Sequence, residues 1–368
     1  MKKKSTFAIL IRLFLFLILL SGVVFLNYSD RWLKNEPVET LSVEEAAGRY
    51  SEEFGVEKNW ILAIIHAESG FDENMVSDTG ELGLMQISPT LYLREIRDLL
   101  GVGNAASDLK KTAFNIRCGT CLFSHFIDYF NEPELALAAY KAGTDTVDSW
   151  IGDPRYAEAG VLKIEELPDE QTRVFLQDAI SYYEKLNKET GKQSVTRPKR
   201  IGEKRKVSPV LCFEWAKKYG ELYGVDPVLV IAMVQVESTF DANATAPGTI
   251  GLTQIKESTY NVDIKANLHL EETYEALYDP EFSIRCCAYY VSWLEERVRR
   301  VGNGGYDQIA AAYNGGINAV REWLASETYS CDGELLYEVL QSVAPVTVNH
   351  VKKIERAYSE WENKSKEG

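Results

Sequence analysis

Two glutamates stand where a carboxyl group could act as a general acid. Glu68 ends a predicted helix over residues 58–68 and falls on its apolar stripe, four residues after Ile64 and three after Ile65. Apolar surroundings and the negative end of the helix dipole both oppose ionisation of such a carboxyl group, which suits a general acid near neutral pH. Glu237 holds the same position in a second apolar helix, 169 residues later.

The same short motifs follow each glutamate in the same order, so most of the chain is one unit written twice. The first copy has Glu68-Ser69, Gly83-Leu84-Met85-Gln86 and Ala139-Tyr140-Lys141-Ala142-Gly143. The second has Glu237-Ser238, Gly251-Leu252-Thr253-Gln254 and Ala312-Tyr313-Asn314-Gly315-Gly316. The stretch from Gly83 to Ile87 predicts backbone that must approach another group closely, with Gln86 as a polar side chain that reads it.

Helical signals place these motifs in two domains. A helix pattern begins at Ser42 and ends at Gly55, and Asp226-Pro227 is typical of a helix start. Further helices are predicted over residues 89–100, 112–130, 134–140, 171–186, 282–298 and 346–361. We expect a stalk at 28–41, a first domain at 42–187, a basic linker at 188–208 and a second domain at 209–362.

Composition narrows the class of protein. The chain has 368 residues, of which 45% are hydrophobic, which is enough for two globular domains. Its net charge of −15 argues against a nucleic-acid partner, because nucleic acids require a basic surface. The sequence identifies no protein partner.

The N-terminus predicts a membrane segment. Lys2, Lys3 and Lys4 precede an apolar run over residues 7–26, near the roughly 20 residues that span a bilayer. The basic flank predicts a cytoplasmic N-terminus, with residues 1–27 as a single-pass anchor and both domains outside the cell membrane. The alternative is a signal peptide, whose removal would release a secreted protein.

Neither a metal nor a cofactor is predicted. Cys118-x-x-Cys121 has the spacing of a redox or zinc motif, but no second pair or histidine follows at ligand spacing. Cys286 falls at the place equivalent to Cys118 in the second copy, so we interpret these thiols as buried packing groups. The four histidines also lack ligand spacing, and the sequence contains no phosphate-binding glycine loop.

Taken together, the repeated motifs resemble the lytic transglycosylase family, of the soluble-transglycosylase catalytic-domain type. The resemblance covers about 42–186 and 209–361 and implies a mainly α fold of the lysozyme-like α+β superfamily, present as two tandem domains. Several positions depart from the family pattern. Lys141 replaces an asparagine, Thr253 replaces a methionine, Ala246 replaces the loop serine that Ser77 matches, and Phe175 and His350 occupy a tyrosine position.

The resemblance also implies a reaction and a substrate, the glycan strands of peptidoglycan. Glu68 and Glu237 would each act as the single acid and base that cleaves between N-acetylmuramic acid and N-acetylglucosamine, leaving a 1,6-anhydro end. Tyr140 and Tyr313 would orient the glutamates. The implied substrate-binding residues are Ser77, Met85, Gln86, Tyr140, Gln254, Tyr313 and Asn314.

Two alternatives remain open at this point. A muramidase would hydrolyse the same bond, usually with a second carboxyl group, and Asp72 and Asp241 each lie four residues after a candidate glutamate. Their place at the start of a turn favours a loop-capping role. A wall-binding scaffold, with one or both domains inactive, would explain the motif departures.

Overall fold

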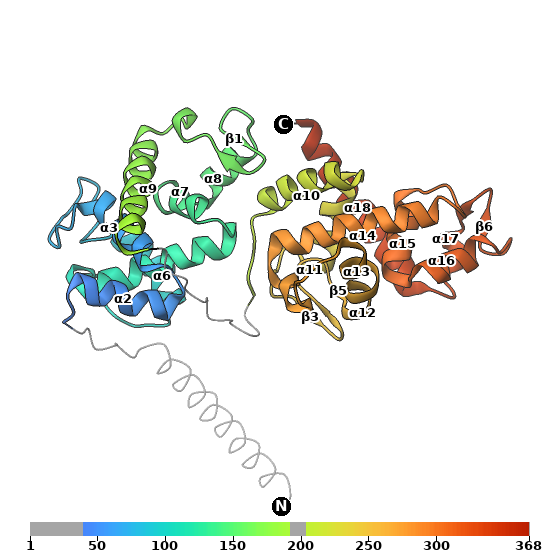
Figure 1. The fold of residues 1–368 in the computed structure, drawn as a ribbon, viewed down its shortest axis with the longest axis horizontal. Helices are drawn as coiled ribbons and strands as arrows, with labels where there is room; N and C mark the ends of the chain where they lie inside the picture. The colour runs from blue at the N-terminus through green and yellow to red at the C-terminus, as the bar shows by residue number, and fades with distance from the viewer. Residues whose placement is uncertain (1–39, 192–203, 368) are drawn as a thin grey trace, which may run out of the picture. The chain divides into compact units, whose positions relative to one another are not determined.

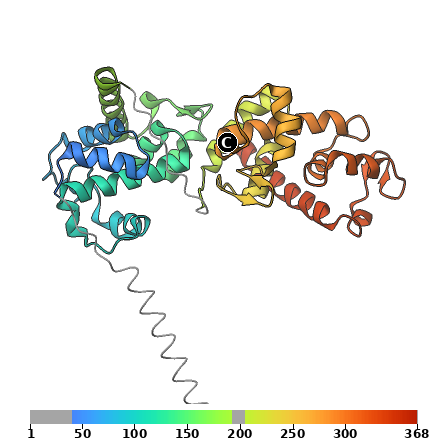
Figure 2. The ribbon, with the colours of Figure 1, turned by 60° about the horizontal axis from the view of Figure 1, so that its bottom comes forward.

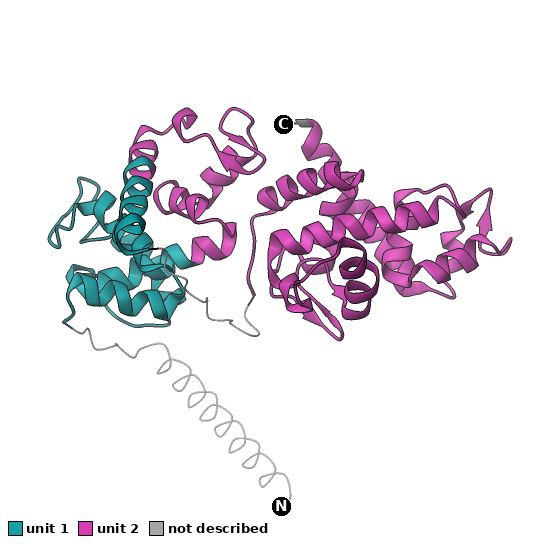
Figure 3. Ribbon diagram, viewed as in Figure 1, with its two compact units in different colours: residues 1–124, 177–198 teal, residues 125–176, 199–368 magenta. Residues whose placement is uncertain are grey.

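The computed structural model describes residues 40–191 and 204–367 (Figure 1). The described chain is mainly helical with a few two-residue strands, as expected. It divides into two compact units, residues 1–124 with 177–198 and residues 125–176 with 199–368 (Figure 3). This division falls inside the first predicted domain, 42–187, whose boundaries stay a prediction.

Helices build the first unit. They are α2 (Val43–Phe54), α3 (Lys58–Ser69), α4 (Pro89–Leu91), the π-helix η1 (Tyr92–Ile96), α5 (Arg97–Leu100), the 3-10 helix η2 (Ala106–Lys110) and parts of α6 (Thr112–Phe130) and α9 (Glu170–Thr190). The side chain of Ser42 caps α2 in a capping box with Glu45, and Gly55 ends it with a φ of 63°. Both ends of α2 are therefore as predicted.

The second unit contains two hairpins, one three-stranded sheet and a larger set of helices. Before the segment that is not described lie α7 (Pro133–Ala142), α8 (Thr144–Ile151), β1 (Ala157–Glu158), β2 (Val161–Leu162) and η3 (Ile164–Glu166). After it come α10 (Pro209–Tyr223), α11 (Pro227–Ser238), β3 (Thr245–Ala246), β4 (Thr249–Ile250), β5 (Ile255–Lys256), α12 (Glu257–Thr259), η4 (Tyr260–Lys265), α13 (Ala266–Leu268) and η5 (Tyr274–Tyr278). The chain ends with α14 (Pro280–Val298), α15 (Tyr306–Gly315), α16 (Ile317–Leu324), β6 (Ser330–Cys331), β7 (Glu334–Leu335), α17 (Tyr337–Leu340) and α18 (Pro345–Glu367).

Helix α11 forms the centre of the second unit. It packs against α10, α14 and α18, and the ribbon shows these helices gathered together from two directions (Figures 1 and 2). Its residues 230–234 are fully buried, because the helix is apolar on all sides. We expected one apolar stripe on this helix, and the structure shows a core helix whose polar end carries Glu237.

A π-helical turn occurs at the same place in both copies, where the sequence predicted an ordinary helix in the first. Tyr92 begins η1 and Tyr260 begins η4, and both side chains are fully buried. Each hydroxyl donates to a backbone carbonyl twelve residues later, Asn104 at 2.7 Å and Glu272 at 2.9 Å. The repeated tyrosine bond shows that the two copies share this local detail as well as their motifs.

The predicted linker, residues 188–208, contains helical or hydrogen-bonded residues at both of its ends. Helix α9 continues to Thr190. Val207 donates its amide to the carbonyl of Phe240 at 3.0 Å, and Ser208 is buried and caps α10. Backbone pairing and capping thus make residues 205–208 part of the second unit, while residues 192–203 are not described.

The predicted anchor, residues 7–26, lies outside the described residues. Within 40–191 and 204–367, no helix is both long and apolar enough to span a bilayer. The prediction for the cysteines is confirmed: Cys118, Cys121 and Cys286 are buried and form no disulfide among the described residues, as expected of packing groups.

Candidate active site

Glu237 lies in the last turn of α11. Asp226 starts this helix by accepting a hydrogen bond from the amide of Val228, and Thr239 ends it in the left-handed conformation. The hydroxyl of Ser238 donates back to the carbonyl of Val234 at 3.1 Å. The helix end therefore has a defined geometry, and the Glu237 side chain keeps 18% of its surface exposed.

Helix α18 supplies the direct partner of Glu237. His350 Nε2 lies 2.9 Å from Glu237 Oε1, and the imidazole is buried. One turn earlier, the hydroxyl of Thr347 donates to Asn314 Oδ1 at 3.0 Å. Thr347 and His350 lie three residues apart and share one helix face, so α18 holds Glu237 and Asn314 with the same turn. The sequence marked His350 only as a departure from the family motif.

Two further titratable groups face Glu237. Burial, aided by the negative charge of Glu237, raises the pKa of the Cys287 thiol to about 12. The same two causes, together with the nearby thiol of Cys287, raise the pKa of Tyr313 well above its usual value. Both groups are consequently neutral near pH 7, and neither supplies a charge to the glutamate.

The Gly251-Leu252-Thr253-Gln254 loop lies beside this helix bundle and is held by its own amide groups. Gly251 has a φ of 75°, and a Cβ there would overlap the carbonyl of Leu277, so the backbone of the loop approaches Leu277 closely. Gln254 Nε2 donates to the carbonyls of Gly251 at 2.8 Å and Ala244 at 3.0 Å, while its Oε1 accepts from Thr249. Gln254 stabilises the loop, and its predicted contact with sugar stays a prediction.

In the first copy, Glu68 and its loop repeat this plan. Glu68 lies at the end of α3 and is buried with 9% exposure, and the hydroxyl of Ser69 donates to Ile65 at 3.0 Å. Gln86 Nε2 donates to the carbonyls of Gly83 at 2.7 Å and Met75 at 3.3 Å. The two candidate acids thus end helices of matching design and precede loops of matching design.

The Met85 side chain is part of the core, and its predicted contact with substrate stays a prediction. Met85 is fully buried, and a Cβ at Gly119 would lie 2.8 Å from its Cβ, so the thioether fills the space above this glycine. Its amide donates to Asn115 Oδ1 at 2.8 Å. Thr253 is the second-copy equivalent and is also fully buried.

The remaining first-copy candidates belong to different compact units. Ser77 lies in the first unit, where its hydroxyl donates a hydrogen bond to the Glu81 carboxylate of the same loop. Tyr140 lies in the second unit, where its ring stacks on Phe175 with centroids 6.4 Å apart. Lys141 Nζ lies 5.3 Å from the same Phe175 ring, so two departures from the motif contact each other. Sugar contacts by Ser77 and Tyr140 stay predictions.

Both aspartates that could have been a second catalytic carboxylate serve loops instead. Asp72 accepts from the amide of Asn74 at 2.9 Å. Asp241 is buried and accepts from the amides of Arg205 at 2.9 Å and Asn243 at 3.0 Å. The predicted loop-capping role of these aspartates is confirmed.

The described part of the chain contains no cluster of three or more histidine, cysteine or acidic side chains arranged to hold a metal ion.

A comparison with protein families defines the class. The model of the transglycosylase SLT domain matches residues 45–160 and again 214–333, more than half of the chain. The chain belongs to this family and carries its domain twice in tandem. The earlier resemblance is confirmed.

Individual relatives match over single-domain lengths. Soluble lytic murein transglycosylase of Salmonella typhimurium is 28% identical over 148 residues, covering 39% of this chain and 22% of the relative. Membrane-bound lytic murein transglycosylase C of Actinobacillus pleuropneumoniae is 26% identical over 160 residues, covering 39% and 44%. Among solved structures, an inactive mutant of lytic transglycosylase Slt from Pseudomonas aeruginosa matches with 30% identity, a TM-score of 0.37, and 41% and 25% coverage. The chain spans about a fifth of the length of the soluble relative.

Proposed function

We propose that this protein is a peptidoglycan lytic transglycosylase. It cleaves the β-1,4 bond between N-acetylmuramic acid and N-acetylglucosamine and leaves a 1,6-anhydro end, with Glu68 or Glu237 as the single acid and base. The observation that carries the proposal is the contrast between two carboxyl groups, those of Glu237 and Asp241. Glu237 is a half-buried carboxyl group at a helix end, while Asp241, four residues later, is engaged by two loop amides.

The reaction needs one carboxyl group in two roles. The protonated glutamate gives its proton to the glycosidic oxygen as the bond from that oxygen to the muramoyl anomeric carbon breaks. The resulting carboxylate then takes the proton of the muramoyl O6 hydroxyl as that oxygen bonds to the anomeric carbon. Proton and electron pairs balance, no water is consumed, and the glutamate returns to its starting state.

The test compares four forms of the full chain: unchanged, Glu68→Gln, Glu237→Gln and both together. Glutamine keeps the size of glutamate and cannot donate an acidic proton. Each form is incubated with peptidoglycan, and the released muropeptides are identified by mass. We expect anhydro products from the unchanged chain and none from the double variant. The single variants show which domain cuts.

A hydrolase would give a different result in the same assay. A muramidase releases reducing ends, which differ from anhydro ends by the mass of one water. Asp72→Asn and Asp241→Asn are matched controls, because a second catalytic carboxylate would be required for hydrolysis and dispensable for the proposed reaction. Retained binding to peptidoglycan without any release would instead support the wall-binding scaffold.

We also propose that residues 7–26 anchor the protein in the cell membrane, with both domains on the outer side. The support is the apolar run and its basic flank. Membrane fractions are washed with alkaline carbonate, and intact cells are treated with protease. An anchored protein stays in the washed membrane and loses its domains to protease. Recovery of a shortened protein from the medium would contradict the anchor and identify a cleaved signal peptide.

A further inference from the structure

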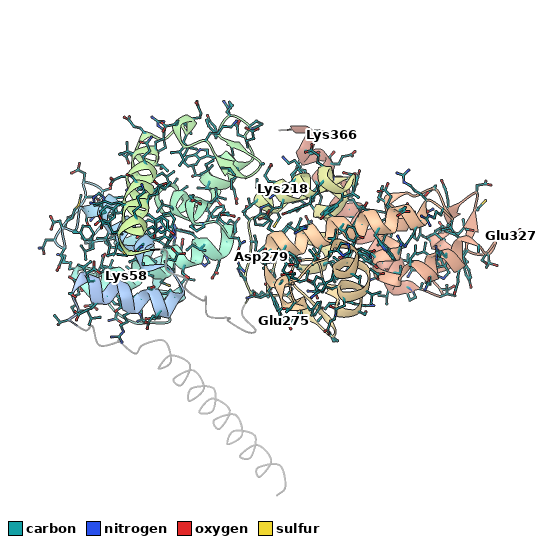
Figure 4. All side chains as sticks on the ribbon, viewed as in Figure 1. Lys58, Lys218, Glu275, Asp279, Glu327 and Lys366 are labelled. Atoms are coloured by element: carbon teal, nitrogen blue, oxygen red, sulfur yellow. The ribbon has the colours of Figure 1, made fainter. Side chains whose placement is uncertain are left out.

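Among the described groups that face Glu237, His350 is the one whose side chain lies within hydrogen-bond distance of its carboxyl group. The groups that face Glu237 are His350 from α18, Cys287 from α14 and Tyr313 from α15. The thiol and the phenol stay neutral for the reasons given above. Helix α10 also packs on α11, and its Lys218, labelled in Figure 4, pairs with Glu281 of α14 at 2.7 Å.

The two ring nitrogens of His350 have different surroundings. Nε2 lies 2.9 Å from Glu237 Oε1. Nδ1 is buried and has no hydrogen-bond partner among the described residues. A proton on Nδ1 would leave a buried N–H group unpaired, which is costly, and a doubly protonated ring would add a charge to that cost. These surroundings favour the neutral ring with its proton on Nε2, donated to Glu237.

We propose that His350 is a positioning residue that decides which oxygen of Glu237 carries the catalytic proton. This inference rests on the proposed function of Glu237. Because Oε1 accepts the Nε2–H bond, the acid proton resides on Oε2. Oε2 gives it to the glycosidic oxygen and later receives the O6 proton. His350 keeps its own proton throughout and holds the carboxyl plane in one orientation. Phe175 occupies the equivalent position in the first copy and has no such donor.

The kinetic test uses the full chain with Glu68→Gln, so that product comes from the second copy alone. His350→Phe removes the donor and keeps a ring of similar size, and it introduces the residue of the first copy. We expect kcat to fall by about tenfold to a hundredfold with little change in KM, because the carboxyl group loses its orientation. His350→Gln supplies an amide N–H, and we expect kcat within about threefold of the parent with an unchanged pH profile.

His269→Gln is the matched control, since His269 is exposed in the same copy, and it should leave kcat unchanged. Thermal unfolding of each variant separates positioning from folding. A His350→Phe chain that keeps the parent kcat overturns the proposal. The proposal is also overturned if the kcat of the His350→Gln chain falls as far as that of His350→Phe and one limb of its pH–rate profile disappears. His350 would then exchange protons itself.

A second measurement is independent of activity. Nitrogen-15 spectra of the histidine side chains in the full chain should show His350 as the Nε2–H tautomer, with a shift when Glu237 is changed to glutamine. If the Glu68→Gln chain releases no product, the proposed function of the second copy fails, and the spectra still decide the pairing. An Nδ1–H tautomer, or a His350 signal unaffected by Glu237→Gln, overturns the positioning role.

Discussion

The hydroxyl of Tyr313 donates a 2.7 Å hydrogen bond to the backbone carbonyl of Thr253. The family resemblance predicted that Tyr313 hydrogen-bonds near Glu237 and orients it. The hydroxyl bonds to the Gly251-Leu252-Thr253-Gln254 loop, with Cys287 Sγ 3.8 Å from it, and the orienting role of Tyr313 stays a prediction. Tyr313 therefore ties helix α15 to that loop, and His350 contacts the glutamate.

Replacing Tyr313 by phenylalanine should destabilise the second copy by about 1 kcal/mol, because it removes one buried hydrogen bond and leaves a carbonyl unpaired. Urea unfolding of the full chain measures the loss. Tyr306→Phe is the control, since the Tyr306 side chain is partly exposed and its ring keeps its stacking on Tyr358 at 4.6 Å. Equal stability of the two variants would show that the bond to Thr253 contributes nothing.

Gly251 should tolerate alanine much less well than Gly248 does. Both residues have a positive φ, 75° and 81°, so both substitutions cost about 1 kcal/mol of backbone strain. Only at Gly251 would the new Cβ overlap the Leu277 carbonyl, which adds about 1–3 kcal/mol. Melting temperatures of the two variants measure the difference. Matching values would refute the close backbone approach of Gly251 to Leu277.

Gly119 and Met85 should behave as a coupled pair. Gly119→Ala forces a methyl group against the Met85 side chain and should destabilise the chain by about 1–3 kcal/mol. In a Met85→Ala background the same change fills vacated space and should cost much less. A double-mutant cycle from urea unfolding gives the coupling energy. Gly48→Ala is the control: it lies in α2 with open space around it, so alanine should stabilise.

Asp148 should make stability fall as pH rises through the mildly acidic range. Burial raises the pKa of Asp148, although hydrogen bonds from Ser208 and Tyr129 oppose the rise. Between the unfolded pKa, about 3.9, and the higher folded value, the folded chain holds a proton that the unfolded chain has released. Stability is thus highest below this window and declines across it. Asp148→Asn should remove this decline, measured as unfolding free energy against pH.

Asp153 serves as the control for this measurement, because its pKa is shifted in the opposite direction. Hydrogen bonds from Arg155 lower the pKa of the exposed Asp153 carboxyl group. Its contribution is present above the unfolded pKa and is lost as pH falls through the folded value. Asp153→Asn should therefore reduce the acid-side loss of stability. Parallel pH curves for Asp148→Asn and the unchanged chain would contradict the assignment.

Local signals in the sequence predicted the helices well. Helix α6 runs over Thr112–Phe130 as predicted, and Asp226 caps α11 as predicted. The π-turn at Tyr92 could not be predicted, because it accompanies a hydroxyl bond to a carbonyl twelve residues away, which leaves no mark in the spacing of apolar residues. The sheet hairpins are only two residues per strand, too short for an alternating pattern.

The candidate site was predictable in its residues and less so in its contacts. Glu237 stands out because a carboxyl group ends an apolar helix. His350 lies 113 residues further along the chain, so its contact with Glu237 depends on the packing of α18. A four-residue motif also cannot show which of its side chains points inward, so the burial of Met85 was not predicted.

One pair of packed positions holds different residues in the two copies, and this difference bears on recombination between the two halves of the gene. Met85 faces Gly119, whereas the equivalent second-copy positions hold Thr253 and Cys287, both fully buried. Recombination between the two halves, with a crossover between these positions, would join methionine to cysteine or threonine to glycine. The first product overfills the site and the second leaves it empty.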